Sequence, residues 1–166
     1  RKALKLVEQS GLPFVIHTGY LEGLGNFLSN ANPEKLTPLF REFPNVRFVL
    51  YHAGYPFWRE AGILAKTYKN VYLDMCFIHV LSEHVYRVLL SEYLELLVPN
   101  KLFAFGADYK TVECTYVQQA VVRRAVMEVM QEKIDRGFYN LDEACFVAQR
   151  ILRDNAVEFY GINKAE

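Results

Sequence analysis

Hydrophobic positions along the chain follow two alternating patterns, short continuous apolar runs and longer segments with apolar side chains at helical spacing. The apolar runs predict buried strands that start near residues 12, 46, 70 and 101. The amphipathic segments predict helices near 1–9, 34–41, 56–68, 83–97, 115–136, 140–152 and 154–160. Strands that alternate with helices at these intervals indicate a parallel α/β sheet with right-handed crossovers.

Turn residues separate these segments. Asn32-Pro33-Glu34 has the order of an N-cap followed by proline in the first helical turn, and Gly137 and Gly161 follow expected helix ends. The segment from Gly19 to Pro33 is rich in glycine and asparagine and too long for a plain turn. We therefore expect an active-site loop there.

Three of the predicted strands end in a polar side chain. The run Phe48-Val49-Leu50-Tyr51 leads into His52, the run Phe14-Val15-Ile16 leads into His17, and Asp108 follows the strand near 101–105. Parallel α/β folds build their sites at the carboxyl ends of strands, and imidazole nitrogen and carboxylate oxygen both bind zinc or a similar divalent ion. A single histidine of this kind is more often a structural one bonded to a backbone carbonyl, but three such ends favour a shared site.

Other polar residues point less clearly to chemistry. His79 and His84 lie in or beside a helix start with no strand beneath them, so we expect capping or exposed roles. Asp74 ends the third strand and is followed by apolar residues, which leaves a structural hydrogen bond and a catalytic role equally open.

Aromatic and charged residues near the strand ends are the candidates for substrate binding. Tyr20 and Tyr55 fit either a substrate wall or packing between strands and helices. Arg59 fits a solvated pair with Glu60 better than a clamp for a substrate carboxylate, although both remain open.

Composition excludes several classes of function. The 166 residues are 52% apolar, enough for one ordinary domain over 1–166 with a real core, and their formal net charge is zero. Balanced charge gives no argument for nucleic acid or an anionic membrane, and no apolar run has the length of a bilayer span. The amino terminus lacks the order of a signal peptide, and Cys76, Cys114 and Cys145 suit free thiols, so we expect a cytoplasmic protein.

Four motifs together resemble the carboxyl-terminal half of the amidohydrolase superfamily. The similarity is greatest to the amidohydrolase-2 group of metal-dependent hydrolases, especially the branch related to the hydrolase part of fungal and bacterial proteins fused to glutamine synthetase. It spans nearly the whole chain and is carried, in order, by Phe14 to Gly19, Leu50 to Gly62, Asn70 to Asp74 and Phe105 to Asp108. The resemblance implies a TIM-like (β/α)8 barrel, represented here by about four βα units and C-terminal helices.

The resemblance also implies roles for individual residues. His17 corresponds to the metal-ligand histidine after the fifth strand and His52 to the catalytic histidine after the sixth. Asp108 corresponds to the aspartate after the eighth strand, which binds metal and can move a proton. The implied cofactor is a divalent metal, with zinc expected, and the implied substrate is a small molecule.

The family's opening His-x-His pair has no counterpart, because the sequence has only four histidines and none form such a pair. We expect the chain to be a fragment of a longer barrel, since Arg1 begins inside a helix, and a fragment need not be active alone. The alternatives to an amidohydrolase-type hydrolase are a non-oxidative decarboxylase or isomerase of the same superfamily and a non-catalytic α/β module. Unpaired barrel edges predict either a homo-oligomer or association with the missing amino-terminal half.

Overall fold

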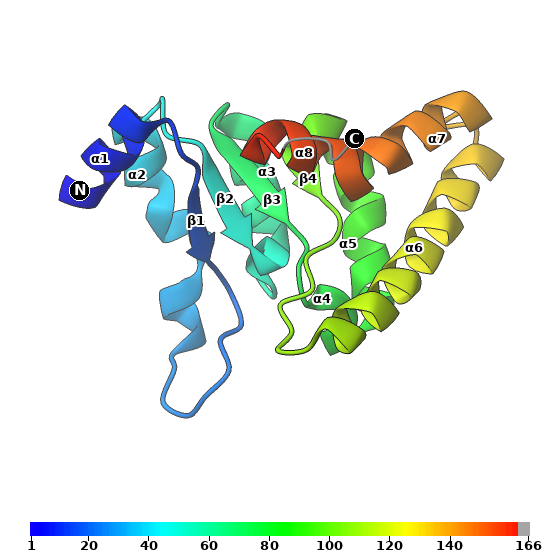
Figure 1. The fold of residues 1–166 in the computed structure, drawn as a ribbon, viewed down its shortest axis with the longest axis horizontal. Coiled ribbons are helices and arrows are strands. Elements are labelled where there is room, and N and C mark those ends of the chain that lie inside the picture. The colour runs from blue at the N-terminus through cyan, green and yellow to red at the C-terminus, as the bar shows by residue number, and fades with distance from the viewer. Residues whose placement is uncertain (163–166) are drawn as a thin grey trace. The chain divides into compact units, whose positions relative to one another are not determined.

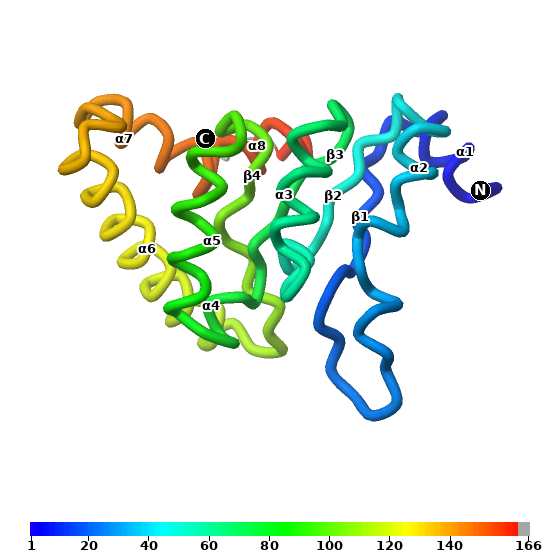
Figure 2. Tube along the Cα trace, turned by 180° about the vertical axis from the view of Figure 1, so that it is seen from behind, coloured from blue at the N-terminus to red at the C-terminus, as the bar shows by residue number. Residues whose placement is uncertain are grey.

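The computed structural model describes residues 1–162, in a first compact unit that spans Arg1–Asp74 and a second that begins at Met75. None of the helices in this described part combines the length and apolar character needed to cross a membrane. Figures 1 and 2 give front and back views of their elements.

The first unit contains three parallel strands in chain order, β1 (Phe14–His17), β2 (Phe48–Tyr51) and β3 (Val71–Asp74). Phe14 lies opposite Phe48, and Phe48 lies opposite Val71, so each strand is in register with the next. Parallel pairing requires a crossover between strands, and each crossover contains helix, as the apolar pattern predicts. Strand β2 coincides with its apolar run, and β1 extends one residue beyond its run to include His17.

The first unit also contains three helices. They are α1 (Lys2–Ser10), α2 (Thr37–Glu42) and α3 (Trp58–Thr67), with 3₁₀ turns at Leu28–Ala31, Pro33–Leu36 and His52–Gly54. Phe48, Val49 and Leu50 of β2 are fully buried, as are Ala61 and Ala65 of α3. The Asn32 side chain accepts a hydrogen bond from the Glu34 N–H at 2.9 Å, the predicted N-cap.

The second unit is mainly helical. Its elements are α4 (Ile78–Leu81), α5 (Glu83–Leu96), a 3₁₀ turn at Pro99–Lys101, β4 (Leu102–Phe103), α6 (Val112–Asp135), α7 (Leu141–Gln149) and α8 (Asn155–Tyr160). The long α6 runs beside α5, and α7 turns back after it (Figure 1). Helix α6 begins three residues before its predicted start, because the Thr111 hydroxyl caps its first turn at the Cys114 N–H.

A π-helical segment at Arg150–Asp154 interrupts the last helical stretch, where the sequence pattern predicts regular helix. The Ile151 carbonyl accepts a hydrogen bond from the Ala104 N–H at 2.9 Å. The Asn155 side-chain amide donates to the carbonyls of Pro99 and Leu102, at 2.7 and 2.8 Å. The irregular turn and the first residue of α8 therefore supply hydrogen-bond partners to the segment around β4.

His79 contradicts the expectation of a capping or exposed role. Its side chain is buried, at 4% exposure. The centroid of its ring lies 5.9 Å from that of Tyr86 and 5.8 Å from that of Phe105. Neither ring nitrogen has a hydrogen-bond partner within the described structure, and burial lowers the pKa of the imidazole to about 4. His84, on α5, is exposed as expected.

Candidate active site

Two of the three predicted strand-end residues meet in the first unit. His17 is the last residue of β1, and His52 immediately follows β2. His17 lies opposite Tyr51 in the register, so parallel pairing brings the two histidines to the same end of adjacent strands. His17 Nδ1 and His52 Nε2 are 3.2 Å apart, and the ring centroids are 4.3 Å apart.

The backbone at His52 has a conformation that L-residues seldom adopt. His52, Ala53 and Gly54 all have positive φ, at 60°, 47° and 70°. A left-handed conformation costs a residue with a side chain about 1–2 kcal/mol, and such strain concentrates at functional sites. Here it turns the chain sharply at the end of β2 and leaves the His52 ring buried beside His17.

The loop that follows His17 is tied to the loop that follows β2. The Thr18 hydroxyl donates to the Tyr51 carbonyl at 2.7 Å, and the Tyr20 N–H donates to the Tyr55 carbonyl at 2.6 Å. Gly19 lies between them, where an added Cβ would be 2.1 Å from the Tyr55 oxygen. In the sequence, the signal for these contacts is limited to the Thr-Gly pair after His17.

A hollow of about 650 Å³ opens beside His17. Its lining includes His17, Tyr20 and Phe27, together with other residues of the loop up to Ala31, which extends beyond the end of β1 in Figure 2. This volume suits a small molecule.

The three expected substrate-binding residues have different positions. Tyr20 lines the hollow, whereas Tyr55 and Arg59 do not. Tyr55 contributes its carbonyl to the loop contacts, and the Arg59 guanidinium lies 4.5 Å from the ring centre of Trp58.

Asp108 belongs to the second unit, where it follows β4 and has a positive φ of 53°. Its loop is held by the Phe77 N–H, which donates to the Gly106 carbonyl at 3.2 Å, and by a ring contact between Phe77 and Tyr109. Convergence of Asp108 with the two histidines stays a prediction. Asp74, at the end of β3, is buried.

The spacing of the histidine pair resembles that of two nitrogen ligands on a divalent ion. Zinc–nitrogen bonds of about 2.1 Å at tetrahedral angles would separate two donors by about 3.4 Å, close to the observed 3.2 Å. Within residues 1–162, no three His, Cys, Asp or Glu side chains form a group that could hold a metal ion. The described residues therefore form no complete shell, and the role of His17 as a metal ligand stays a prediction.

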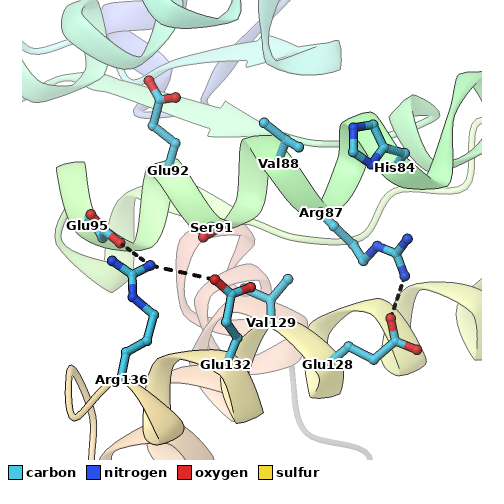
Figure 3. A pocket seen from close by; sticks show the side chains of 10 residues that line it. All are labelled: His84, Arg87, Val88, Ser91, Glu92, Glu95, Glu128, Val129, Glu132 and Arg136. Atoms are coloured by element: carbon cyan, nitrogen blue, oxygen red, sulfur yellow. Dashed lines mark hydrogen bonds and ion pairs between the residues drawn. The ribbon is translucent and has the colours of Figure 1, made fainter.

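A second hollow, of about 640 Å³, lies between α5 and α6 and is shown in Figure 3. Ion pairs cross it, from Arg87 to Glu128 at 2.6 Å and from Arg136 to Glu95 at 3.6 Å. Its lining comes from these two helices and from Arg136, which directly follows α6, and both of its arginines pair with glutamates across the groove. These features indicate helix–helix stabilisation and not a catalytic site.

Parallel α/β architecture with paired imidazoles at adjacent strand ends is the arrangement expected of the amidohydrolase superfamily. Residues 1–162 match the family described as Amidohydrolase, and the chain belongs to that family. The family assignment made from the four motifs is confirmed.

One curated relative and two solved structures extend this result. The chain is 33% identical over 164 residues to protein fluG of Emericella nidulans, covering 98% of this chain and 19% of that protein. It resembles the structure of a protein described as a metal-dependent hydrolase from Lactobacillus casei, with a TM-score of 0.81 and 21% identity, over 96% of this chain and 42% of that one. It also resembles a uronate isomerase from Bacillus halodurans, with a TM-score of 0.82 and 18% identity. This match covers 97% of this chain and 41% of that one.

The chain thus spans about a fifth of the curated relative and about two-fifths of each solved chain. The predicted fold class, part of a TIM-like (β/α)8 barrel with parallel strands, is confirmed by these structural matches. A hydrolase-type role in the superfamily and a divalent metal both agree with the family and with the neighbour described as metal-dependent.

Proposed function

We propose that the chain contributes the metal and acid–base residues of a hydrolase that activates water for attack on a C–N or ester-like bond. The observation that carries this proposal is the contact between His17 and His52 at adjacent strand ends, in a chain of the Amidohydrolase family. A structural histidine pair would not need a small-molecule hollow beside it, as His17 has.

Each residue has a distinct task in this proposal. His17 and Asp108 hold the metal, and His52 orients or deprotonates the attacking water or stabilises the developing oxyanion. Asp108 then passes a proton to the leaving group. A divalent ion bound there, with zinc as our choice, would supply Lewis acidity at the substrate carbonyl and would lower the pKa of a bound water toward neutrality.

Substrate binding is assigned to the wall of the hollow and its surroundings. Tyr20 lines the hollow, and we assign its side chain to substrate binding. Tyr55 and Arg59 are proposed to act when the substrate is bound, with Arg59 already preorganised on the Trp58 ring. An isomerase of the same superfamily is the second candidate, because one structural neighbour is described as a uronate isomerase. A decarboxylase would use the same metal and acid–base groups.

The test uses the complete polypeptide that contains this segment. Its metal content is measured by mass spectrometry, and its activity is measured as the hydrolysis of p-nitrophenyl esters and N-acyl amino acids. We expect His17→Ala and Asp108→Ala to abolish turnover and lower bound metal. His52→Ala should reduce turnover by about 10²-fold or more with a smaller loss of metal. His84→Ala, an exposed histidine on α5, is the control. Full turnover in the Asp108 variant would remove the hydrolytic proposal.

A further inference from the structure

The two ring nitrogens of His17 have different partners, and one partner identifies the tautomer. His17 Nε2 is 2.8 Å from the Tyr20 carbonyl oxygen. A carbonyl oxygen can only accept a hydrogen bond, so Nε2 must carry the hydrogen. In a neutral imidazole this leaves the lone pair on His17 Nδ1.

That lone pair faces the second histidine. His52 Nε2 lies 3.2 Å from His17 Nδ1, so in the neutral pair His52 Nε2 is the donor. A directed series results, in which His52 donates to His17 and His17 donates to the Tyr20 carbonyl. One backbone oxygen therefore sets which nitrogens of both rings carry hydrogen.

We infer that Tyr20 is a positioning residue and that the segment 18–31, here named the latch loop, fixes the tautomers of the histidine pair through the Tyr20 carbonyl. Moving the latch loop away releases His17 Nε2 and removes the preference for one tautomer. The catalytic importance of this control rests on the proposed hydrolytic function, whereas the tautomer itself does not.

The latch loop is held at its base by contacts that keep the Tyr20 carbonyl in place. The Tyr20 N–H donates to the Tyr55 carbonyl while the Tyr20 carbonyl accepts from His17, so both backbone polar groups of Tyr20 are engaged. The Gly19 N–H donates to the Ala31 carbonyl at 2.8 Å, which closes the loop on itself. The Thr18 hydroxyl bond to Tyr51 anchors the first residue.

The same loop lines the hollow beside His17. A small molecule that enters the hollow therefore touches the segment that fixes the tautomer. Occupancy of the hollow and the hydrogen positions of the histidine pair are coupled through one backbone carbonyl, and the coupling acts in both directions.

The experiment is nitrogen NMR of the complete polypeptide that contains this segment, labelled with ¹⁵N-histidine and freed of metal, at pH 8, where an ordinary imidazole is neutral. The His17 signals are identified by their loss in His17→Gln. We expect widely separated nitrogen shifts for His17, with the hydrogen on Nε2. If the His17 ring of the unaltered protein carries its hydrogen on Nδ1, that result is enough to overturn the inference.

Two loop variants test the role of the latch loop. Gly19→Ala would place a Cβ against the Tyr55 carbonyl and displace the loop, so the two His17 nitrogen shifts should collapse toward their average. Thr18→Val removes only the hydroxyl bond and should give a partial collapse, and it decides the question if Gly19→Ala does not fold. The control is Gly11→Ala, where φ is also positive, at 68°, but an added Cβ has no neighbour within 4 Å.

An unchanged tautomer pattern in the folded loop variants would overturn the inference that the latch loop fixes the tautomers. The result is independent of the proposed function, because no metal, substrate or turnover enters the measurement. A confirmed latch with no hydrolysis by the complete polypeptide would leave the inference standing and reject the hydrolase.

Discussion

His52 and His79 are both buried histidines, but their surroundings differ. The His52 ring has a hydrogen-bonding partner in His17. The His79 ring faces the aromatic rings of Tyr86 and Phe105, and its nitrogens have no partner within the described structure. Burial without a partner disfavours the charged form, which is why the pKa of His79 is lowered to about 4.

This difference predicts an acid-sensitive second unit. His79 binds a proton more readily in the unfolded chain, at an ordinary pKa of 6.5, than in the folded one. The free energy of unfolding should therefore fall as the pH falls from about 6.5 toward 4, by on the order of 3 kcal/mol. Urea unfolding between pH 4.5 and 7.5, followed by circular dichroism, measures this slope.

His79→Phe keeps a ring and removes both nitrogens, so its unfolding free energy should lose most of that pH dependence. His84→Gln, at an exposed site on α5, should keep the slope of the parent chain. An equal slope in the parent and in His79→Phe would show that other groups account for acid sensitivity.

Sequence reasoning found His17 and His52 because each follows an apolar run, and parallel pairing then brings strand ends together. It failed at His79 because the burial of a side chain on the four-residue helix α4 depends on Tyr86 and Phe105, which come later in the chain. No local pattern of polar and apolar residues carries that information. The same limit hid the Tyr20 carbonyl, whose importance appears only when its hydrogen bonds are known.

Helices α5 and α6 are joined by ion pairs of unequal exposure. The Lys133 side chain is fully buried and donates to Glu95, whose side chain is 44% exposed. Hydrogen bonding to Lys133, and then its charge, lowers the pKa of Glu95. The stability that this pair provides is present at neutral pH and is lost as the pH falls through the lowered pKa.

Removing the carboxylate of Glu95 should therefore destabilise the protein more than removing the buried charge of Lys133. Glu95→Gln leaves the buried Lys133 ammonium without its counter-charge and should lower the free energy of unfolding by about 2 kcal/mol, since water reaches the exposed side of Glu95. Lys133→Met replaces the charge with an apolar chain of similar length and should be neutral or stabilising. Urea unfolding at pH 7 measures both.

Glu132→Gln is the matched control for this pair. Glu132 lies on α6, as Lys133 does, and pairs with Arg136 at 3.6 Å, but the side chains of Glu132 and Arg136 are both well exposed. Its effect should stay within about 0.5 kcal/mol. Equal costs for the Glu95 and Glu132 variants would show that burial of Lys133 does not decide the energy of the network.

The regular elements were predictable because their signal is local. Helices α3 and α5 follow apolar spacing, and Asn140 forms the capping box that starts α7, with its side chain accepting from the Glu143 N–H. The π-helical turn at Arg150–Asp154 was not predictable, because its Ile151 carbonyl serves Ala104, 47 residues earlier in the chain. Contacts across such separations depend on tertiary pairing, which spacing alone does not determine.

The whole chain should not stay monomeric in solution. Among the described residues, β1 lies at an end of the strand order and pairs with β2 alone, and its Val15 is 37% exposed. An edge strand with an outward apolar residue offers unpaired N–H and C=O groups to another chain. Sedimentation velocity at micromolar concentration should show a species of twice the chain's mass, formed by two copies around a two-fold axis.

Val15→Lys should shift that equilibrium to the monomer, because a charged side chain on an edge strand opposes further pairing. Ile63→Lys, at an exposed apolar residue on helix α3, controls for a general effect of added charge. A compact monomer of the parent chain at the same concentration would reject association through this edge.

The contacts at Thr18 and Tyr20 also divide the latch loop into an anchored base and an exposed tip. Leu24 and Phe27 at the tip are exposed, and an added Cβ at Gly25 would have no neighbour within 4 Å. Changes at the tip can alter the wall of the hollow without disturbing His17. A directed-evolution library for new substrates should therefore randomise residues 21–28 and leave residues 17–20 unchanged, so that diversity is placed where the scaffold tolerates it.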